Sequence, residues 1–301
     1  LLKQAVEKNR IAPAYLFTGY PGIGRKLAAK CFIELLFCSH VAHDKHSRIK
    51  KQLELGNHPD IFWVQPTYLH QGKRLTVSEA TEAGLKRKSP PQIRVEQIRE
   101  ITQFLSRPPL EASRAIVVIE DAQTMAEGAA NALLKTLEEP GKATLILIAP
   151  GVDSLLPTLV SRCQRIPFYP LSFDEMKQVL QQTGHEDIVQ DSVLLAIAQG
   201  SPGEAISSWQ QRQEIPQDLL EKLTSTLNTQ LNALLLAKEV DKTLDTEAQL
   251  WLLDYLQYSY WKKVQHPKII QVLETAKKAL LSYAQPRLVW EVTLLELSQV
   301  S

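Results

Sequence analysis

The chain has 301 residues, which is enough for two or three domains with at least one large buried core. Hydrophobic residues make up 44% and charged residues 22% of it, as in an ordinary soluble globular protein. The 34 Lys and Arg residues nearly balance the 33 Asp and Glu residues, so the net charge of +1 argues neither for nor against a nucleic-acid partner.

Three widely spaced cysteines do not make a disulfide framework, and a chain of this length needs none. No apolar run approaches the roughly 18 residues of a membrane span, and the sequence shows no secretory signal. We therefore expect a protein of the reducing cytoplasm. Because the chain begins at Leu1 and not at Met, we also expect that some native N-terminal sequence is absent.

Up to about residue 168, apolar strand patterns alternate with helical periodicity. The predicted elements, in chain order, are a strand at 14–19, a helix at 25–38, a strand at 60–66, a helix at 95–106, a strand at 115–121, a helix at 124–140 and a strand at 143–150. Because these strands are apolar almost throughout, the pattern predicts a parallel α/β sheet with helices on both faces.

Beyond about residue 170 the alternation disappears and the pattern becomes helical. Short helices are broken at Gly184 and Gly200, and from about residue 215 the helical periodicity continues to the end. The sequence therefore predicts an α/β domain at 1–168, a small helical domain at 169–212 and an all-α domain at 213–301.

The segment 67–94 is polar and is predicted to be a flexible insertion in the α/β domain. Its part from residue 71 onward carries six basic and two acidic groups. The run Lys86, Arg87 and Lys88 is a possible DNA contact. Because no aromatic residues are interleaved with it, we favour the interpretation as a solvated loop.

The sequence GYPGIGRK has the glycine spacing of a phosphate-binding loop, G-x-x-x-x-G-K-[ST], with Gly19, Gly22 and Gly24. In a working loop the lysine reaches the phosphates and the hydroxyl holds Mg²⁺. Arg25 and Lys26 stand at these two places. A guanidinium is larger and forked, and an ammonium cannot coordinate Mg²⁺. We therefore expect a P-loop fold without productive nucleotide chemistry.

The predicted strand at 115–121 ends in Glu120 and Asp121, where P-loop ATPases place acids that hold Mg²⁺ and orient the attacking water. Glu120 stands where the shorter Asp that holds the metal belongs, and Asp121 stands where the longer Glu belongs. Since positioning is most of this chemistry, the exchange predicts a degenerate site. The alternative is an active ATPase in which Arg25 replaces the lysine and Glu120 holds Mg²⁺.

Five stretches, GYPGIGR, GNHPDI, EDAQTM, NALLKTLEEP and LVSRC, resemble in order and spacing the clamp-loader branch of the AAA+ ATPases. The resemblance extends over essentially the whole chain and is most specific before residue 165. It implies an AAA+ P-loop domain followed by a helical lid and a C-terminal helical collar that oligomerises. It also implies a hetero-oligomeric ring with ATP-binding partner subunits, which loads a sliding clamp onto primed DNA.

The resemblance also implies a role for Arg162 in the SRC sequence, as an arginine finger inserted into the ATP site of the adjacent subunit. The alternative is that Arg162 forms only a surface ion pair. Pro150, and Gly203 with Glu204, stand where ATP-hydrolysing relatives present sensor residues. We therefore expect a non-hydrolysing subunit of a DNA polymerase holoenzyme, with no catalysis by the isolated chain. The rivals are an active ATPase and, with less support, an autonomous DNA-binding protein.

Many relatives carry a small zinc module just before the HPD sequence. Asp44, Ser47 and Lys50 stand at its cysteine positions, and this set makes no tetrahedral zinc site. We expect no metal and no cofactor in this chain, with ATP bound by the neighbouring subunits. A substitute zinc site is the alternative. Its ligands would be Cys38, His40, His43 and His46.

Overall fold

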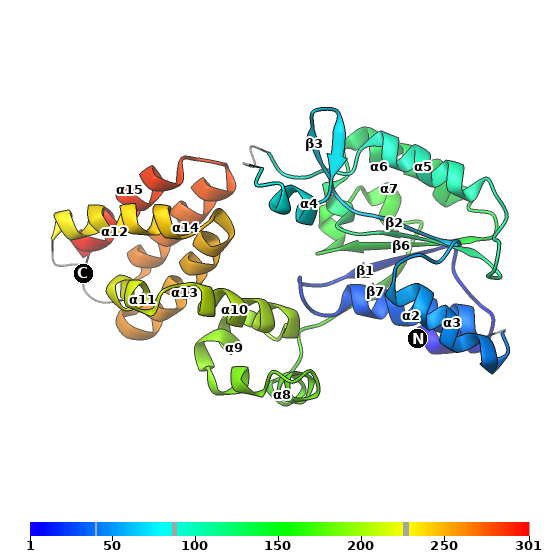
Figure 1. Ribbon diagram of the computed structural model, residues 1–301, viewed down its shortest axis with the longest axis horizontal. Coiled ribbons are helices and arrows are strands. Elements are labelled where there is room, and N and C mark those ends of the chain that lie inside the picture. Colours follow the sequence, from blue (N-terminus) through cyan, green and yellow to red (C-terminus); the bar gives the residue numbers. More distant parts are fainter. Residues whose placement is uncertain (40, 86–88, 225–228, 301) are drawn as a thin grey trace. The chain divides into compact units, whose positions relative to one another are not determined.

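The computed structural model describes residues 1–39, 41–85, 89–224 and 229–300 (Figure 1). It divides into two compact units, Leu1–Tyr169 and Pro170–Ser301, and each is described by itself. The predicted domain borders at 168 and 212 stay predictions. Four residues singled out above lie outside the described residues, namely His40, Lys86, Arg87 and Lys88.

A five-stranded sheet, parallel throughout, forms the centre of the first unit, in the order β2-β5-β6-β1-β7. Its strands are β1 (Ala14–Thr18), β2 (Ile61–Val64), β5 (Ala115–Ile119), β6 (Ala143–Ala149) and β7 (Gln164–Pro167). The structure confirms the predicted α/β fold class. The edge strand β7 was not predicted, because only Ile166 in it is buried and its sequence lacks an apolar run.

Helices cover both faces of this sheet, as Figure 1 shows. One face carries α1 (Leu2–Glu7), α2 (Arg25–Cys38) and α3 (His43–Glu54), and the other carries α5 (Val95–Leu105), α6 (Glu127–Glu138) and α7 (Pro157–Val160). Along β6, Leu145 and Leu147 belong to one core, whereas Ile146 and Ile148 belong to the other. The strands are apolar at every position because alternate side chains enter different cores. Short 3₁₀ turns η1 (Ala122–Thr124) and η2 (Val152–Ser154) follow β5 and β6.

The predicted insertion at 67–94 contains regular structure that the sequence did not reveal. Strands β3 (Tyr68–His70) and β4 (Lys73–Leu75) form an antiparallel hairpin, and α4 (Val77–Glu82) follows. Thr76 and Glu79 close a capping box at the start of α4. Arg74 donates two hydrogen bonds to the Glu100 carboxylate on α5, at 2.5 and 3.2 Å, which attaches the hairpin to the domain. The predicted flexibility of the segment stays a prediction.

The second unit is helical over its described residues. A small core that includes Met176 and Leu180 gathers α8 (Phe173–Gln182), η3 (Glu186–Gln190), α9 (Ser192–Ala198) and α10 (Pro202–Glu214). A larger core gathers α11 (Gln217–Thr224), α12 (Gln230–Thr243), α13 (Thr246–Val264), α14 (Pro267–Leu281) and α15 (Pro286–Val300). In the larger core, the fully buried Trp290 donates its indole N–H to Gln249 at 2.9 Å. The predicted all-helical pattern after residue 170 is confirmed.

Candidate functional site

The glycine pattern after β1 builds the turn of a phosphate-binding loop. A Cβ on Gly19 would lie 2.6 Å from the carbonyl oxygen of Phe168, whose N–H donates to Thr18 O at 2.7 Å. Gly24 is the N-cap of α2 and has φ +95°, in the left-handed region that favours glycine. Glycine is therefore required at position 19 because two chain segments approach closely, and at position 24 because of the backbone conformation. Helix α2 begins after this turn, as it does in a P-loop.

Arg25, in place of the P-loop lysine, is the first residue of α2 and is only 8% exposed. Its Nη1 is buried, and no hydrogen-bond partner for it is found among the described residues. Burial lowers the pKa of Arg25, and the nearby Asp121 carboxylate opposes that shift. A buried cation with an unused donor is a group that can accept an anion from the adjoining cavity.

Lys26, in place of the magnesium-holding hydroxyl, forms an ion pair with Glu120. Its Nζ lies 2.7 Å from Glu120 Oε1, and it also lies 5.7 Å from the centre of the Trp63 ring. The same carboxylate oxygen accepts hydrogen bonds from the indole N–H of Trp63 and from Gln65 Nε2, the latter at 3.2 Å. This donor set differs from that of a magnesium site, since an ammonium and two N–H groups already surround the carboxylate oxygen.

The structure brings together all the predicted residues of the nucleotide site except Gly19. They line one cavity of about 550 Å³ at the start of α2 and the end of β5. The members are Gly22, Gly24, Arg25, Lys26, Glu120 and Asp121.

Two partners of Glu120 were missed by sequence reasoning. Trp63 lies in β2 and Gln65 directly follows that strand. The neighbouring β2 and β5 end together, with Val64 opposite Ile119, so residues near the ends of the two strands meet. The apolar runs indicated both strands but not their order in the sheet, which was the information needed.

The Arg162 side chain is part of a separate cluster beyond α7. Its exposed fraction is 35%, and it is not among the residues that line the P-loop cavity. Nη1 donates to the carbonyl oxygen of Thr158 at 2.9 Å, and Nη2 donates to Glu138 Oε1 at 2.6 Å. Within the chain itself Arg162 therefore forms a surface ion pair. Glu138 is a contact that the sequence did not suggest.

The GNHPDI stretch holds a loop of the first unit in place. The Asp60 carboxylate, which is 2% exposed, accepts the backbone N–H groups of Leu110, Glu111 and Ala112 at 2.6 to 2.7 Å. The Asp60 N–H donates to His58 Nδ1 at 3.2 Å, and burial lowers the pKa of His58. These contacts fix the loop that leads into β5, and Glu120 directly follows that strand.

The cysteine and histidine positions near α3 have other contacts. His46 Nε2 lies 3.1 Å from the carbonyl oxygen of Cys38, and its ring lies tilted against the His43 ring, with centroids 4.6 Å apart. Lys50 pairs with Glu34 at 3.0 Å. Within the part of the chain that the structure describes, no group of three or more His, Cys, Asp or Glu side chains is placed to hold a metal ion. The absence of zinc stays a prediction.

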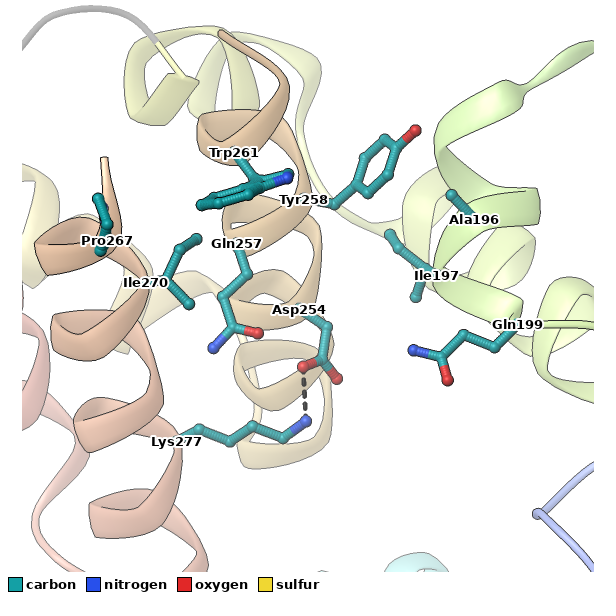
Figure 2. Close-up of a pocket in the computed structure, with 10 residues that line it drawn as sticks. All are labelled: Ala196, Ile197, Gln199, Asp254, Gln257, Tyr258, Trp261, Pro267, Ile270 and Lys277. Carbon is teal, nitrogen blue, oxygen red and sulfur yellow. Dashed lines mark hydrogen bonds and ion pairs between the residues drawn. The ribbon is translucent and has the colours of Figure 1, made fainter. Parts of the chain in front are cut away.

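A second cavity, of about 610 Å³, lies in the second unit among α9, α13 and α14 (Figure 2). Tyr258 and Trp261 contribute aromatic rings from α13, and Ile270 contributes an aliphatic side chain from α14. An ion pair between Asp254 and Lys277, at 2.5 Å, joins the two helices beside it. None of the residues that line this cavity belongs to the predicted nucleotide site, arginine finger or zinc positions. No helix in the described ranges is long and apolar enough to cross a membrane.

Two adjoining family models match the chain. The model described as "DNA polymerase III, delta subunit" matches residues 1–172. The model described as "Cyanobacterial DNA polymerase III delta prime, C-terminal domain" matches residues 174–297. Together they account for nearly the whole chain, and they meet close to the border between the two compact units.

Individual relatives agree with these models. DNA polymerase III subunit delta' of Bacillus subtilis is 36% identical over 57% of this chain and 46% of its own length. The subunit of the same name from Pseudomonas aeruginosa is 33% identical over 64% of this chain and 54% of its own. The chain thus spans about half the length of these curated relatives.

A solved structure shows the same fold. The crystal structure of a DNA polymerase III gamma subunit-related protein from Thermotoga maritima aligns with a TM-score of 0.55, at 18% identity, over 99% of this chain and 97% of that one. At this identity the likeness concerns the fold alone. From the two family models and the relatives that carry the same name, the chain belongs to the DNA polymerase III delta' family.

Proposed function

We propose that this chain is a clamp-loader subunit that hydrolyses no ATP itself and supplies Arg162 to the ATP site of a neighbouring subunit. Its partners would be the ATPase subunits and the delta subunit of a hetero-oligomeric ring in the cytoplasm. Through that ring it would act on the sliding clamp and on primer-template DNA. Membership of the delta' family supports this role. The residues around the P-loop cavity and those around Arg162 supply the chemical argument for it.

The observation that carries the non-hydrolysing part is the ion pair between Lys26 and Glu120. ATP hydrolysis in P-loop proteins needs a divalent cation that bridges phosphate oxygens and neutralises the charge that develops on them. Here the acid that would help to hold this cation is paired with an ammonium tethered to α2. A dissolved cation would have to displace an ammonium that is tethered beside the carboxylate at a high effective concentration, so tight binding of Mg²⁺ is disfavoured.

The position of Arg162 supports its role as a donor to another subunit. A finger must lie at the surface to reach a neighbour, and this guanidinium is partly exposed at the end of α7. The planar fork of arginine matches the spacing of phosphoryl oxygens and offsets negative charge in the transition state. Its hydrogen bonds within the chain are exchangeable, because both are exposed to solvent.

Exposed apolar side chains in the second unit support assembly with other subunits. Leu231 and Leu235 on α12 are 67% and 58% exposed, and Leu288 and Val292 on α15 are 57% and 49% exposed. The two helices pack on each other. Apolar side chains that gather on neighbouring elements are typical of a surface covered by a partner, as proposed for a collar.

One observation favours the rival, an active ATPase with a divergent loop. Arg25 lines the P-loop cavity, and its buried Nη1, for which no hydrogen-bond partner is found among the described residues, could bind a phosphate oxygen if the side chain turned it into the cavity. That contact would permit nucleotide binding, but turnover would still lack a magnesium ligand at position 26 and correctly spaced acids. We therefore favour binding without hydrolysis as the most that this cavity supports.

The test is to mix the purified chain with candidate ATPase subunits and to measure ATP turnover with and without it. The proposal predicts that the chain raises the turnover of its partners and has none alone. A partner rate that is indifferent to the presence of the chain would contradict the proposed role.

A further inference from the structure

Two nitrogens of the Arg162 guanidinium already donate hydrogen bonds within the chain. Nη2 donates to Glu138 Oε1 at 2.6 Å, and Nη1 donates to Thr158 O at 2.9 Å. Each of these nitrogens carries a second N–H, but the N–H groups that make these two bonds cannot donate fully to a phosphoryl oxygen of a neighbour at the same time. We call this conformation, in which both bonds are made within the chain, the parked conformation of Arg162.

We propose that Glu138 is a positioning residue that holds Arg162 in this parked conformation, so that the finger becomes available only when a phosphoryl oxygen replaces the Glu138 carboxylate. This inference rests on the proposed function of Arg162. It adds a residue, Glu138, and a competition between two anions for the same guanidinium edge.

The backbone around the pair favours an exchange of side chains over a movement of helices. Glu138 is the last residue of α6, and Arg162 follows the C-cap of α7. The two helices pack on each other, and Leu137 and Leu159, next to this pair, are buried in the same core. The backbone at both residues is therefore held by packed helices, and the ion pair can open through rotation of the two side chains alone.

The charge of Glu138 at this place also indicates a specific role. A carboxylate at the C-terminal end of a helix faces the negative end of the helix dipole, which is unfavourable unless a cation lies beside it. Arg162 provides such a cation beside Glu138, in addition to Lys135 in the last turn of α6. Without the finger in its parked position, Glu138 would repel the carbonyl groups at the end of α6.

The strength of the contact suits a latch that a partner can open. The side chains of Arg162 and Glu138 are 35% and 52% exposed, so solvent screens their attraction. Exposed ion pairs shift an equilibrium by a factor of about five at most. If the Arg162 side chain is free of Glu138 only part of the time, removing the Glu138 carboxylate raises the population of the free side chain. The turnover at the neighbouring site then rises by the same factor.

The experiment uses the chain in its complex with the ATPase subunits and compares Glu138→Gln with the wild type. We expect turnover at the neighbouring site to rise about two- to fivefold. The change should appear in kcat and not in KM, because a finger acts on charge that develops in the transition state. The advantage should shrink as salt is added, since ions weaken the parked pair of the wild type.

Glu139→Gln is the matched control, because it removes the same charge one position further along the chain. The Glu139 side chain is exposed, and no contact between it and Arg162 is found among the described residues. It should leave the rate unchanged. The variant that combines Glu138→Gln with Arg162→Ala should behave like Arg162→Ala alone. Glu138→Ala provides a second test of the latch, and the melting temperature of each variant checks that it is folded.

A rate that is unchanged or lowered in both folded Glu138 variants, while Arg162→Ala lowers it, would overturn the latch and leave the trans-acting finger intact. An equal gain in Glu139→Gln would also overturn it, because general electrostatics would then explain the effect. If Arg162→Ala itself changes nothing, the proposed function fails and the latch fails with it.

Discussion

The ammonium of Lys26 lies 2.7 Å from Oε1 of Glu120, at the place where a working P-loop ATPase would bring a hydroxyl and an acid to one magnesium ion. A covalently attached cation thus takes over the charge neutralisation that a metal would provide. The carboxylate is mostly buried and receives further N–H donors from Trp63 and Gln65. Under the proposed function, the fold of the site is kept while its chemistry is altered.

This relationship predicts that the isolated chain hydrolyses no ATP above background. The double change Arg25→Lys with Lys26→Thr should recover nucleotide binding at most, because Glu120 and Asp121 still have exchanged lengths. Binding is measured by titration with a nucleotide in the presence of Mg²⁺, and turnover by phosphate release. Turnover by the wild type that Glu120→Ala abolishes would support the rival ATPase.

Gly19→Ala should destabilise the first unit by about 2 kcal/mol or more, as expected for overpacking against backbone. The added methyl would lie 2.6 Å from Phe168 O, and β7 would have to move away from β1. Gly151→Ala is the control, since a Cβ there meets nothing within 4 Å. Urea unfolding of both variants measures the difference, and equal stabilities would show that the close approach is easily relaxed.

Asp60→Asn should destabilise the chain by about 2–4 kcal/mol, because a charged carboxylate that accepts several buried backbone N–H groups is replaced by a neutral amide. The amide also presents N–H donors to N–H donors at the loop of Leu110 and Ala112. The exposed Asp153→Asn is the matched control. Chemical denaturation checks this, and a loss no larger than that of the control would contradict the structural role of the HPD sequence.

The stability of the first unit should fall as the pH drops below the ordinary His58 pKa of 6.5. Burial lowers the folded-state pKa of His58, so the unfolded chain binds the proton more readily. The stabilisation from neutral His58 is therefore complete above pH 6.5 and is lost as the pH falls through the lowered folded value. His58→Asn, which can still accept the Asp60 N–H, should show a weaker pH dependence between pH 7 and 5 in unfolding experiments. Identical profiles would contradict it.

The sequence was informative where a pattern is local. Apolar strands such as β1 and β6 predicted the parallel sheet, and the spacing of Gly19 and Gly24 predicted the loop between β1 and α2. Arg25 and Lys26 indicated a degenerate site before any geometry was known, because their charges and shapes are wrong for the two positions that they occupy.

Features that depend on contacts between distant segments escaped the sequence. The hairpin β3–β4 has strands of three residues, too short for a periodic signal. Glu138 is 24 residues from Arg162, and nothing in the sequence pairs them. Trp63 could be assigned to Glu120 only after the order of β2 and β5 in the sheet was known.

The central claim concerns Arg162, and the most direct measurement is ATP turnover and clamp loading by the complex that carries Arg162→Ala. The variant should fold and assemble normally, because the side chain is at the surface and buries little apolar area. A finger is typically worth about 10³–10⁵ in rate, and the observed loss should be smaller because other sites in the ring keep their own fingers. Arg162→Lys should not rescue the rate fully, since an ammonium lacks the planar fork. A complex with Arg162→Ala that assembles normally and both turns over ATP and loads clamps at the unmodified rate would contradict the account.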